Sequence, residues 1–165
     1  MNKILVGIIS DTHDNRTNIV RAVELFNRKG AFLVVHAGDM VAPFTALDFR
    51  ALSCPMEMVF GNNDGERIGL VNSFKDIGTL QPGPRTFSFQ GKKFLLMHES
   101  GCLDEVINAA GVDVIIYGHT HHEDVRPGHP LVINPGEAGG WLTGKATIAV
   151  LDLETMAVEI ISLNS

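Results

Sequence analysis

The sequence is poor in cysteine and in positive charge. Its 165 residues include two cysteines, Cys54 and Cys102, which cannot form a disulfide framework and have no CxxC partner. This usage favours the reducing cytoplasm. Lys and Arg number 13 against 19 Asp and Glu, giving a net charge of −6, and the sequence has no run of basic residues. We therefore do not expect long nucleic acids as partners.

The sequence also lacks a long apolar segment at its start. The first apolar run, residues 4–9, follows directly after Met1-Asn2-Lys3, is far too short to span a bilayer and has no small-residue cleavage site. We expect neither a signal peptide nor a membrane partner. The composition, 45% hydrophobic and 19% charged, is that of a globular protein, and the length predicts a single domain over residues 1–165.

Short apolar runs and helical periodicities alternate in the first half of the chain. Three strands are expected, over Lys3–Ser10, Ala31–Ala37 and Met56–Phe60. Each is followed by an expected helix, over Asn15–Lys29, Pro43–Leu52 and Glu66–Ile77. This βαβαβα order indicates a parallel sheet.

The second half has a different pattern, dominated by strands. We expect a hairpin of Thr86–Phe89 with Lys93–Met97, a helix over Leu103–Ala110, strands over Val112–Tyr117 and Leu131–Asn134, a loop over Pro135–Gly144, and a hairpin of Ala146–Leu153 with Ala157–Leu163. The whole predicts an α/β fold in which a two-sheet mixed β-sandwich is flanked by helices.

Five short polar clusters follow expected strands. They supply seven residues that can bind metal through oxygen or imidazole nitrogen: Asp11, His13, Asp39, Asn62, His98, His119 and His121. Because ligands of open α/β sheets bind at the carboxyl ends of the strands, we expect these side chains to meet on one rim. A mixed oxygen and nitrogen set suits Mn, Ni, Fe, Co or Zn.

Each cluster taken alone has a simpler explanation. Asp11 or Asp39 could be a helix N-cap or a turn residue, and His98 could be a hydrogen-bonded core histidine. The Gly-His-Thr-His sequence at residues 118–121 could be an exposed loop. All these explanations would have to hold at once at equivalent strand ends, so the sequence favours a metal site.

In this order, Asp-x-His at 11–13, Gly-Asp at 38–39, Gly-Asn-x-Asp at 61–64, His98 and Gly-His-x-His at 118–121 resemble the calcineurin-like metallophosphoesterase superfamily. The small single-domain prokaryotic phosphodiesterases are the most similar group, over nearly the whole chain. The resemblance implies a four-layer αββα fold and two divalent ions, with Mn or Ni favoured. One ion would be held by Asp11, His13, Asp39 and His121, and the other by Asp39 as a bridge, Asn62, His98 and His119.

The implied reaction is hydrolysis of small phosphodiester or nucleotide substrates. Two cations roughly 3.5–4 Å apart lower the pKa of a shared water toward about 7, so that a metal-bridging hydroxide can attack phosphorus. Both cations absorb the charge that develops on the phosphate oxygens. No serine or cysteine nucleophile is needed, and none stands in a convincing triad.

The Gly-Asn-x-Asp motif departs from the superfamily pattern at its third position. Many relatives have His there, which is taken to steady the transition state or protonate the leaving group, whereas this sequence has Asn63. An amide donates a hydrogen bond but no proton near neutral pH. Asp64 would ordinarily orient the missing His. We expect catalysis to use Asp39, Asn62, Asn63 and Asp64, with slow turnover or a bias toward activated leaving groups.

Several other residues have open roles. His36 is expected in the core or behind the ligands, and His129 on the surface. Glu99 could crowd the second ion or reach substrate, and His122 could be a contact or a plain loop residue. The glycine-rich segment 135–144 is no P-loop; it is either a flexible connection or a rim whose Trp141 contacts substrate or a neighbouring subunit.

Two other functions compete with the phosphodiesterase. A non-catalytic interaction scaffold, as in the retromer-subunit branch of the superfamily, is supported by the missing His at Asn63 and opposed by the retention of all seven ligand positions. A nuclease is chemically open, although the acidic balance and the short chain disfavour long nucleic acids as its substrates. A homodimer or higher homo-oligomer is compatible with the sequence.

Overall fold

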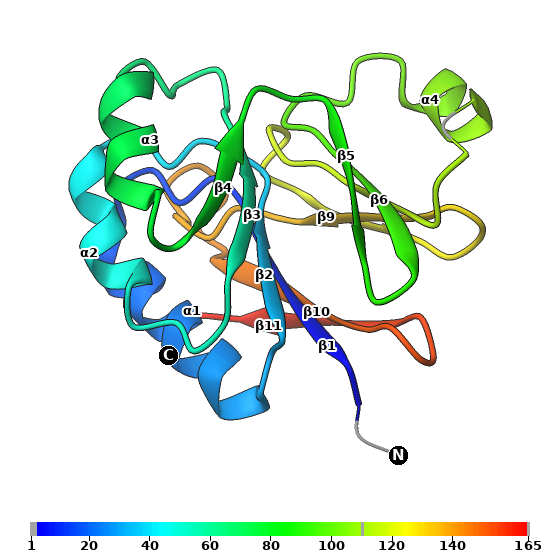
Figure 1. Ribbon diagram of the computed structural model, residues 1–165, viewed down its shortest axis with the longest axis horizontal. Coiled ribbons are helices and arrows are strands. Elements are labelled where there is room, and N and C mark those ends of the chain that lie inside the picture. Colours follow the sequence, from blue (N-terminus) through cyan, green and yellow to red (C-terminus); the bar gives the residue numbers. More distant parts are fainter. Residues whose placement is uncertain (1–2, 110, 165) are drawn as a thin grey trace.

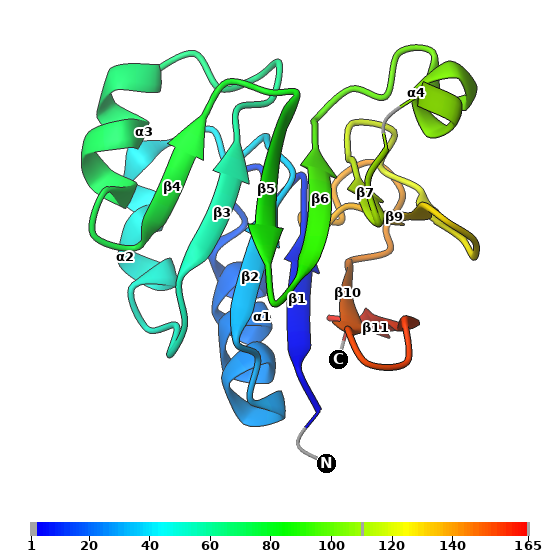
Figure 2. The same ribbon diagram turned by 45° about the vertical axis from the view of Figure 1, so that its right-hand side comes forward.

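The chain folds into two mixed β-sheets with helices on both outer sides. The computed structural model describes residues 3–109 and 111–164. The expectations for the chain start at Met1 and Asn2, and for Ala110 in a helix, lie outside these residues. Figures 1 and 2 show α1, α2 and α3 beside one sheet and α4 beside the other.

The larger sheet has the strand order β11-β10-β1-β2-β3-β4. Its strands are β1 (Leu5–Ile9), β2 (Leu33–His36), β3 (Met56–Val59), β4 (Gly78–Gln81), β10 (Thr147–Asp152) and β11 (Ala157–Ser162). The first four are parallel, as the βαβ pattern predicts. The β10–β11 hairpin joins antiparallel to β1, with Leu5 opposite Asp152.

The smaller sheet has the order β5-β6-β7-β9-β8. Its strands are β5 (Arg85–Phe89), β6 (Lys92–Leu96), β7 (Val114–Ile116), β8 (Glu123–Arg126) and β9 (Leu131–Pro135). β5 and β6 form the expected hairpin, and β6, β7 and β9 are parallel. The parallel strands of both sheets thus end in loops that carry the candidate ligands.

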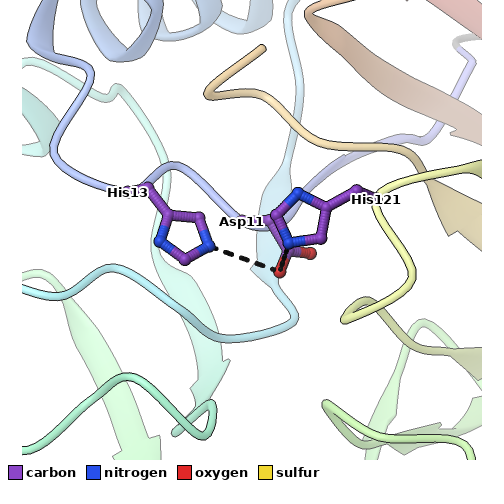
Figure 3. Close-up of side chains that lie close together, drawn as sticks. All are labelled: Asp11, His13 and His121. Atoms are coloured by element: carbon purple, nitrogen blue, oxygen red, sulfur yellow. Dashed lines mark ion pairs between the residues drawn. The ribbon is translucent and has the colours of Figure 1, made fainter. Parts of the chain in front are cut away.

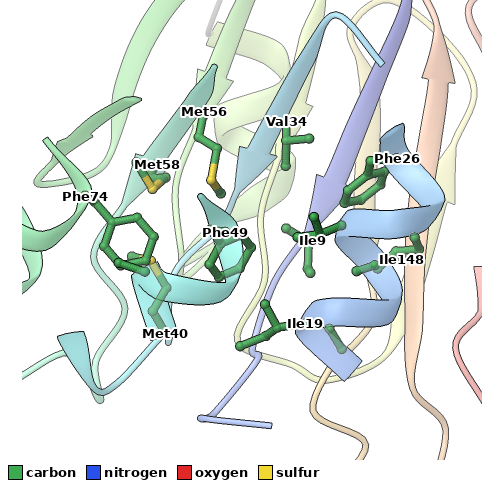
Figure 4. Packing of buried hydrophobic residues seen from close by; sticks show 14 of the residues in the cluster. Ile9, Ile19, Phe26, Val34, Met40, Phe49, Met56, Met58, Phe74 and Ile148 are labelled. Atoms are coloured by element: carbon green, nitrogen blue, oxygen red, sulfur yellow. The ribbon is translucent and has the colours of Figure 1, made fainter. Parts of the chain in front are cut away.

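Three apolar layers hold the four structural layers together. α1 (Arg16–Lys29), η1 (Pro43–Thr45), α2 (Ala46–Phe49) and α3 (Arg67–Phe74) pack on the larger sheet through residues such as Phe26, Phe49 and Phe74 (Figure 4). A second cluster lies between the sheets, including Ile8 and Ile116. A third joins α4 (Leu103–Ala109) to the smaller sheet. The observed order is therefore the expected αββα.

The amino end of α1 fixes the glycine-rich segment beside the site. The Asn15 side chain caps the helix by accepting from the Asn18 N–H at 3.2 Å, and its Nδ2 donates to the Gly139 carbonyl at 2.8 Å. Asn18 Nδ2 donates to the Ala138 carbonyl at 2.9 Å. These bonds hold residues 138–139 against the helix start.

Several expected boundaries were wrong. The region expected as the helix Pro43–Leu52 is a 3₁₀ turn followed by a helix that ends at Phe49, and the helix expected to reach Ile77 ends at Phe74. Strands β4 and β8 were not expected. Pro135 belongs to β9, so the loop expected over Pro135–Gly144 begins one residue later, and its residues 136–139 are buried.

Over the part of the chain that the structure covers, no helix combines the length and the apolar character needed to cross a membrane.

Candidate metal centre

The seven candidate ligands lie at the carboxyl ends of five strands, from both sheets. β1, β2 and β3 of the larger sheet supply four of them, and β6 and β7 of the smaller sheet supply the others: Asp11, His13, Asp39 and Asn62, then His98, His119 and His121. Backbone hydrogen bonds join the loops, including Asp11 N–H to the Gly38 carbonyl and Gly118 N–H to the His98 carbonyl, both at 3.0 Å. The structure thus brings all five clusters to one rim.

One group of side chains is formed by Asp11, His13 and His121 (Figure 3). The Oδ1 atom of Asp11 lies 3.5 Å from His121 Nε2 and 3.9 Å from His13 Nε2. His13 Nε2 is also 3.3 Å from Oδ2 of Asp39. Two imidazole nitrogens and two carboxylates therefore converge in one cradle.

A second group adjoins the first through Asp11 and Asp39. His98 Nε2 lies 3.4 Å from Asp39 Oδ2 and 4.0 Å from Asp11 Oδ1. The Asn62 amide oxygen is 2.9 Å from His98 Nε2 and 3.0 Å from His119 Nδ1. Asp39 thus faces both groups, since the same Oδ2 atom lies close to His13 in the first group and to His98 in the second.

The backbone at the centre is held in an unusual conformation. Five of the seven candidate ligands have a positive φ: Asp11, His13, Asp39, His119 and His121. Left-handed backbone costs roughly 1–3 kcal/mol per non-glycine residue and concentrates at functional sites. Since such strain persists only where the surrounding structure imposes it, the fold favours these side-chain positions over local relaxation.

Glycines next to the ligands allow the loops to approach each other. A Cβ atom on Gly61 would lie 2.1 Å from Oδ1 of Asp39, and a Cβ on Gly118 would lie 2.0 Å from Oγ of Ser10 and 2.7 Å from Oδ2 of Asp11. No side chain fits at either position. The Gly-Asn and Gly-His pairs of the motifs are therefore requirements of close packing as well as of the chain turn.

The tautomers of two histidines are set by bonds on the side away from the cradle. His121 Nδ1 lies 2.7 Å from a carboxylate oxygen of Glu137, and His98 Nδ1 lies 2.7 Å from the Ala37 carbonyl. Each Nδ1 therefore donates its proton outward when the ring is neutral, and each Nε2 lone pair faces inward. This arrangement is common behind metal-bound histidines.

Glu137 was missed at the level of sequence. Its buried carboxylate also accepts from the Leu142 N–H at 3.0 Å, the Thr143 N–H at 2.6 Å and the Thr143 hydroxyl at 2.8 Å. Burial alone would raise the pKa of Glu137, but these donors and His121 lower it overall. One carboxylate thus connects the His121 imidazole with the segment that carries Trp141.

Asp64 and Asn63 surround Asp39. Asp64 accepts from the backbone N–H groups of Asp39 at 2.9 Å, Gly61 at 2.7 Å and Val41 at 2.7 Å. Asn63 donates to both Asp39 oxygens at 2.8 Å, from its backbone N–H and from its side-chain amide. The observed contacts give Asp64 a role in joining two loops and Asn63 a role in orienting Asp39.

His36 is a core residue. It is fully buried, accepts from the Gly38 N–H through Nδ1 at 3.0 Å, and its Nε2 lies 3.2 Å from the Thr12 hydroxyl. The ring must therefore carry its proton on Nε2. Burial lowers the pKa of His36 to about 3, so the ring is neutral.

The remaining residues with open roles lie around the rim. Trp141 is 65% exposed and donates from Nε1 to the His13 carbonyl at 3.1 Å. Glu99 is exposed and lines a hollow next to His98. His122 and His129 are exposed. Contact of Trp141 with substrate or a neighbouring subunit stays a prediction, and His129 is at the surface as predicted.

The donor set fits a metal ion. Oδ1 of Asp11 and Nε2 of His13 are buried and have no hydrogen-bond partner among residues 3–109 and 111–164. The Asp11 and Asp39 carboxylates raise the pKa of His13 to about 10, which reflects uncompensated negative charge in the cradle. A divalent cation would satisfy both atoms and this charge, and imidazole with carboxylate suits first-row transition metals.

Comparison with known proteins agrees with this geometry. Residues 4–156 match the calcineurin-like phosphoesterase superfamily domain. Phosphodiesterase MJ0936 of Methanocaldococcus jannaschii is 40% identical over 156 residues, 90% of this chain and 93% of that protein. The structure of a novel archaeal phosphodiesterase superposes with a TM-score of 0.90 at 38% identity, covering 96% of this chain and 99% of the other.

A more distant likeness concerns the fold alone. Vacuolar protein sorting 29 from Cryptosporidium parvum has a TM-score of 0.64 at 18% identity, with 97% of this chain and 96% of the other covered. The fold thus occurs in proteins of very different sequence. Since the family match spans most of the chain and a 40% identical relative spans nearly all of it, this protein belongs to the calcineurin-like phosphoesterase superfamily.

Proposed function

We propose that this protein is a phosphodiesterase that hydrolyses small phosphodiester or nucleotide substrates with two divalent transition-metal ions, Mn or Ni favoured. The observation that carries the proposal is that two groups of possible ligands share Asp11 and are joined by Asp39, whose Oδ2 lies 3.3 Å from His13 Nε2 and 3.4 Å from His98 Nε2. The 40% identical archaeal relative is named a phosphodiesterase, which supports diesters as substrates.

The ligand assignment in this proposal follows the two groups. Asp11, His13, Asp39 and His121 would hold one ion, and Asp39, Asn62, His98 and His119 the other. Bound cations supply a water that is acidic enough to act as a nucleophile at neutral pH, and positive charge for the phosphate oxygens. Oδ1 of Asp11 lies within 4.0 Å of both His98 and His121, so Asp11 also faces both positions.

The protein's own groups prepare this centre. Glu137 fixes the His121 ring, and Asn63 fixes both oxygens of Asp39 through two N–H donors. Asn63 has no proton to give near neutral pH, so the leaving group would depart best when it is stable as an anion. We therefore expect faster turnover of aryl than of alkyl esters.

The experiment is hydrolysis of bis-para-nitrophenyl phosphate with and without added Mn or Ni. The parent should turn over only with metal, and Asp39→Asn should nearly abolish turnover and lower the bound metal. Asp76→Asn is the matched control, because Asp76 is an exposed acid at the far end of the larger sheet. Turnover that persists without metal would contradict the proposal.

The competing scaffold function predicts a different result. A chain that binds no Mn or Ni after loading and hydrolyses no diester would favour the scaffold. The retention of an oriented ligand set, with Asp11, Asp39 and His98 buried, argues for the enzyme, since a pure interaction surface gains nothing from left-handed backbone at five of these positions.

We also propose a cytoplasmic location, supported by two cysteines that form no disulfide. A homo-oligomer stays a prediction; the exposed Trp141 and Leu142 side chains, 65% and 76% accessible, would be its contact surface.

A further inference from the structure

A hollow of about 360 Å³ opens directly beside the candidate ligands Asn62 and His98. Its walls come from both sheets: the loop after β3, the start of α3, the β4–β5 connection and the residues after β6. This volume lies near the lower end of the roughly 300–1,000 Å³ found for small-molecule sites. The hollow, here called the arginine pocket, is therefore sized for one small organic group.

The most distinctive wall of the arginine pocket is the Arg67 side chain. Its Cζ atom lies 4.8 Å from the centre of the Phe60 ring, and its Nε donates to the Asp64 carbonyl at 3.2 Å. Over the described parts of the chain, no carboxylate pairs with Arg67, and its two terminal nitrogens make no hydrogen bond. The guanidinium is thus held by one face and one N–H, with its second face left for a ligand.

The other walls favour a flat, uncharged group. Pro84 and Met97 contribute apolar surface, and Glu99 places an exposed carboxylate at the rim. A carboxylate there accepts hydrogen bonds from amino or hydroxyl groups and repels a second phosphate. A stacking cation, an apolar wall and an acceptor together match a nucleobase with its ribose, since bases stack on arginine planes.

We propose that the arginine pocket binds the nucleoside arm of a phosphodiester whose phosphate lies at the candidate metal centre, with the base stacked on the Arg67 guanidinium. This inference rests on the proposed phosphodiesterase function and narrows its substrates to nucleoside diesters without further phosphates. It also gives Glu99 a role as an acceptor for the nucleoside.

The test is isothermal titration calorimetry, which measures the equilibrium binding of adenosine, AMP and ribose 5-phosphate to the full chain with and without Mn. The parent should bind adenosine and AMP more tightly than ribose 5-phosphate. By analogy with alanine substitution of an aromatic side chain that stacks on a base, Arg67→Ala should weaken adenosine binding by about 5- to 150-fold. Arg67→Lys should lose nearly as much, because lysine keeps the charge without the plane.

Controls separate stacking from charge and from misfolding. Arg50→Ala removes one exposed arginine at the far end of the larger sheet and should leave adenosine binding unchanged. Glu99→Ala changes an exposed side chain and should weaken adenosine binding even if the Arg67 variants fold poorly. Thermal unfolding of each variant checks its fold.

Two outcomes would overturn the inference. If the parent protein does not bind adenosine, the arginine pocket is not a nucleoside site. If Arg67→Ala weakens the binding of AMP and ribose 5-phosphate but leaves the binding of adenosine unchanged, Arg67 contacts the phosphate and not the base. Neither result depends on turnover, so failure of the pocket is distinguishable from failure of bis-para-nitrophenyl phosphate hydrolysis.

Discussion

The buried Glu137 carboxylate is directly coupled to a candidate ligand, through its 2.7 Å bond to His121. Glu137→Gln keeps the size and removes the charge, which lowers the basicity of the His121 ring. We expect Mn affinity to fall about 10- to 100-fold, the usual cost of losing such a partner. Calorimetric titration of Mn measures it, with the neighbouring exposed Glu123→Gln as the control. Equal affinities in the two variants would contradict this role.

The buried His36 ring should make the stability of the folded chain depend on pH. Its pKa is about 3 in the folded chain and near 6.5 when unfolded, so between these values the unfolded state binds more protons. Stability contributed by the neutral ring is therefore present above pH 6.5 and is lost as pH falls, by about 1.4 kcal/mol per pH unit. Urea unfolding of the EDTA-treated chain from pH 7 to 5 measures this slope.

His36→Gln is the comparison, because an amide keeps a donor and an acceptor but does not titrate here. The charges of Asp11, Asp39, His13 and His98 are common to both chains, so the difference in slope isolates His36. The same pH dependence in parent and variant would show that His36 takes up no additional proton on unfolding.

At the scale of elements, strand ends from the two sheets pack against each other with no space between them. A Cβ on Gly118 would meet Ser10 and Asp11, while a Cβ on Gly65 meets no atom within 4 Å. Gly118→Ala should cost about 1–3 kcal/mol through overpacking and should weaken metal binding. Gly65→Ala should stay near parental stability. Chemical unfolding and Mn titration of both variants test this. Equal unfolding free energies and equal Mn affinities in the two variants would show that the close approach of the Gly118 loop to Ser10 and Asp11 is not required.

The same elements show what sequence can predict. The buried strand β1, with its continuous apolar run, and α1, with Asn15 and Gly30 at its ends, were predicted well because burial and capping leave strong patterns. The edge strands β4 and β8 were missed. Glu123–Arg126 is mostly charged and partly exposed, so its strand state comes from pairing with β9 and not from its own pattern.

The candidate site divides in the same way. The ligand residues stood out because each follows an apolar run with a short motif. Glu137 did not, since it lies in a glycine-rich segment and its contact with His121 depends on how the loops meet in three dimensions. Its one sequence signal was its position shortly after the expected strand Leu131–Asn134.

For the molecule as a whole, the metal centre should couple binding to stability. The side chains of Asp11 and Asp39 are buried close together, and without a cation the repulsion between their negative charges opposes folding. Metal at about 1,000 times its dissociation constant should stabilise the chain by about 4 kcal/mol, and EDTA should reverse this. Differential scanning calorimetry of parent and Asp39→Asn measures the shift, which should be much smaller in the variant. An unchanged melting temperature at saturating Mn would contradict this coupling.

The strand order of the larger sheet has a consequence for how the protein is made. β1 leaves the ribosome long before one of its two neighbours, β10, which is formed by residues 147–152. His121 and Glu137 also emerge late. A nascent polypeptide that stops before these residues therefore has the candidate ligands Asp11 and His13 without their partners, and we expect it to be catalytically silent. Chemistry toward phosphate esters would begin only after residues 147–152 have left the ribosome.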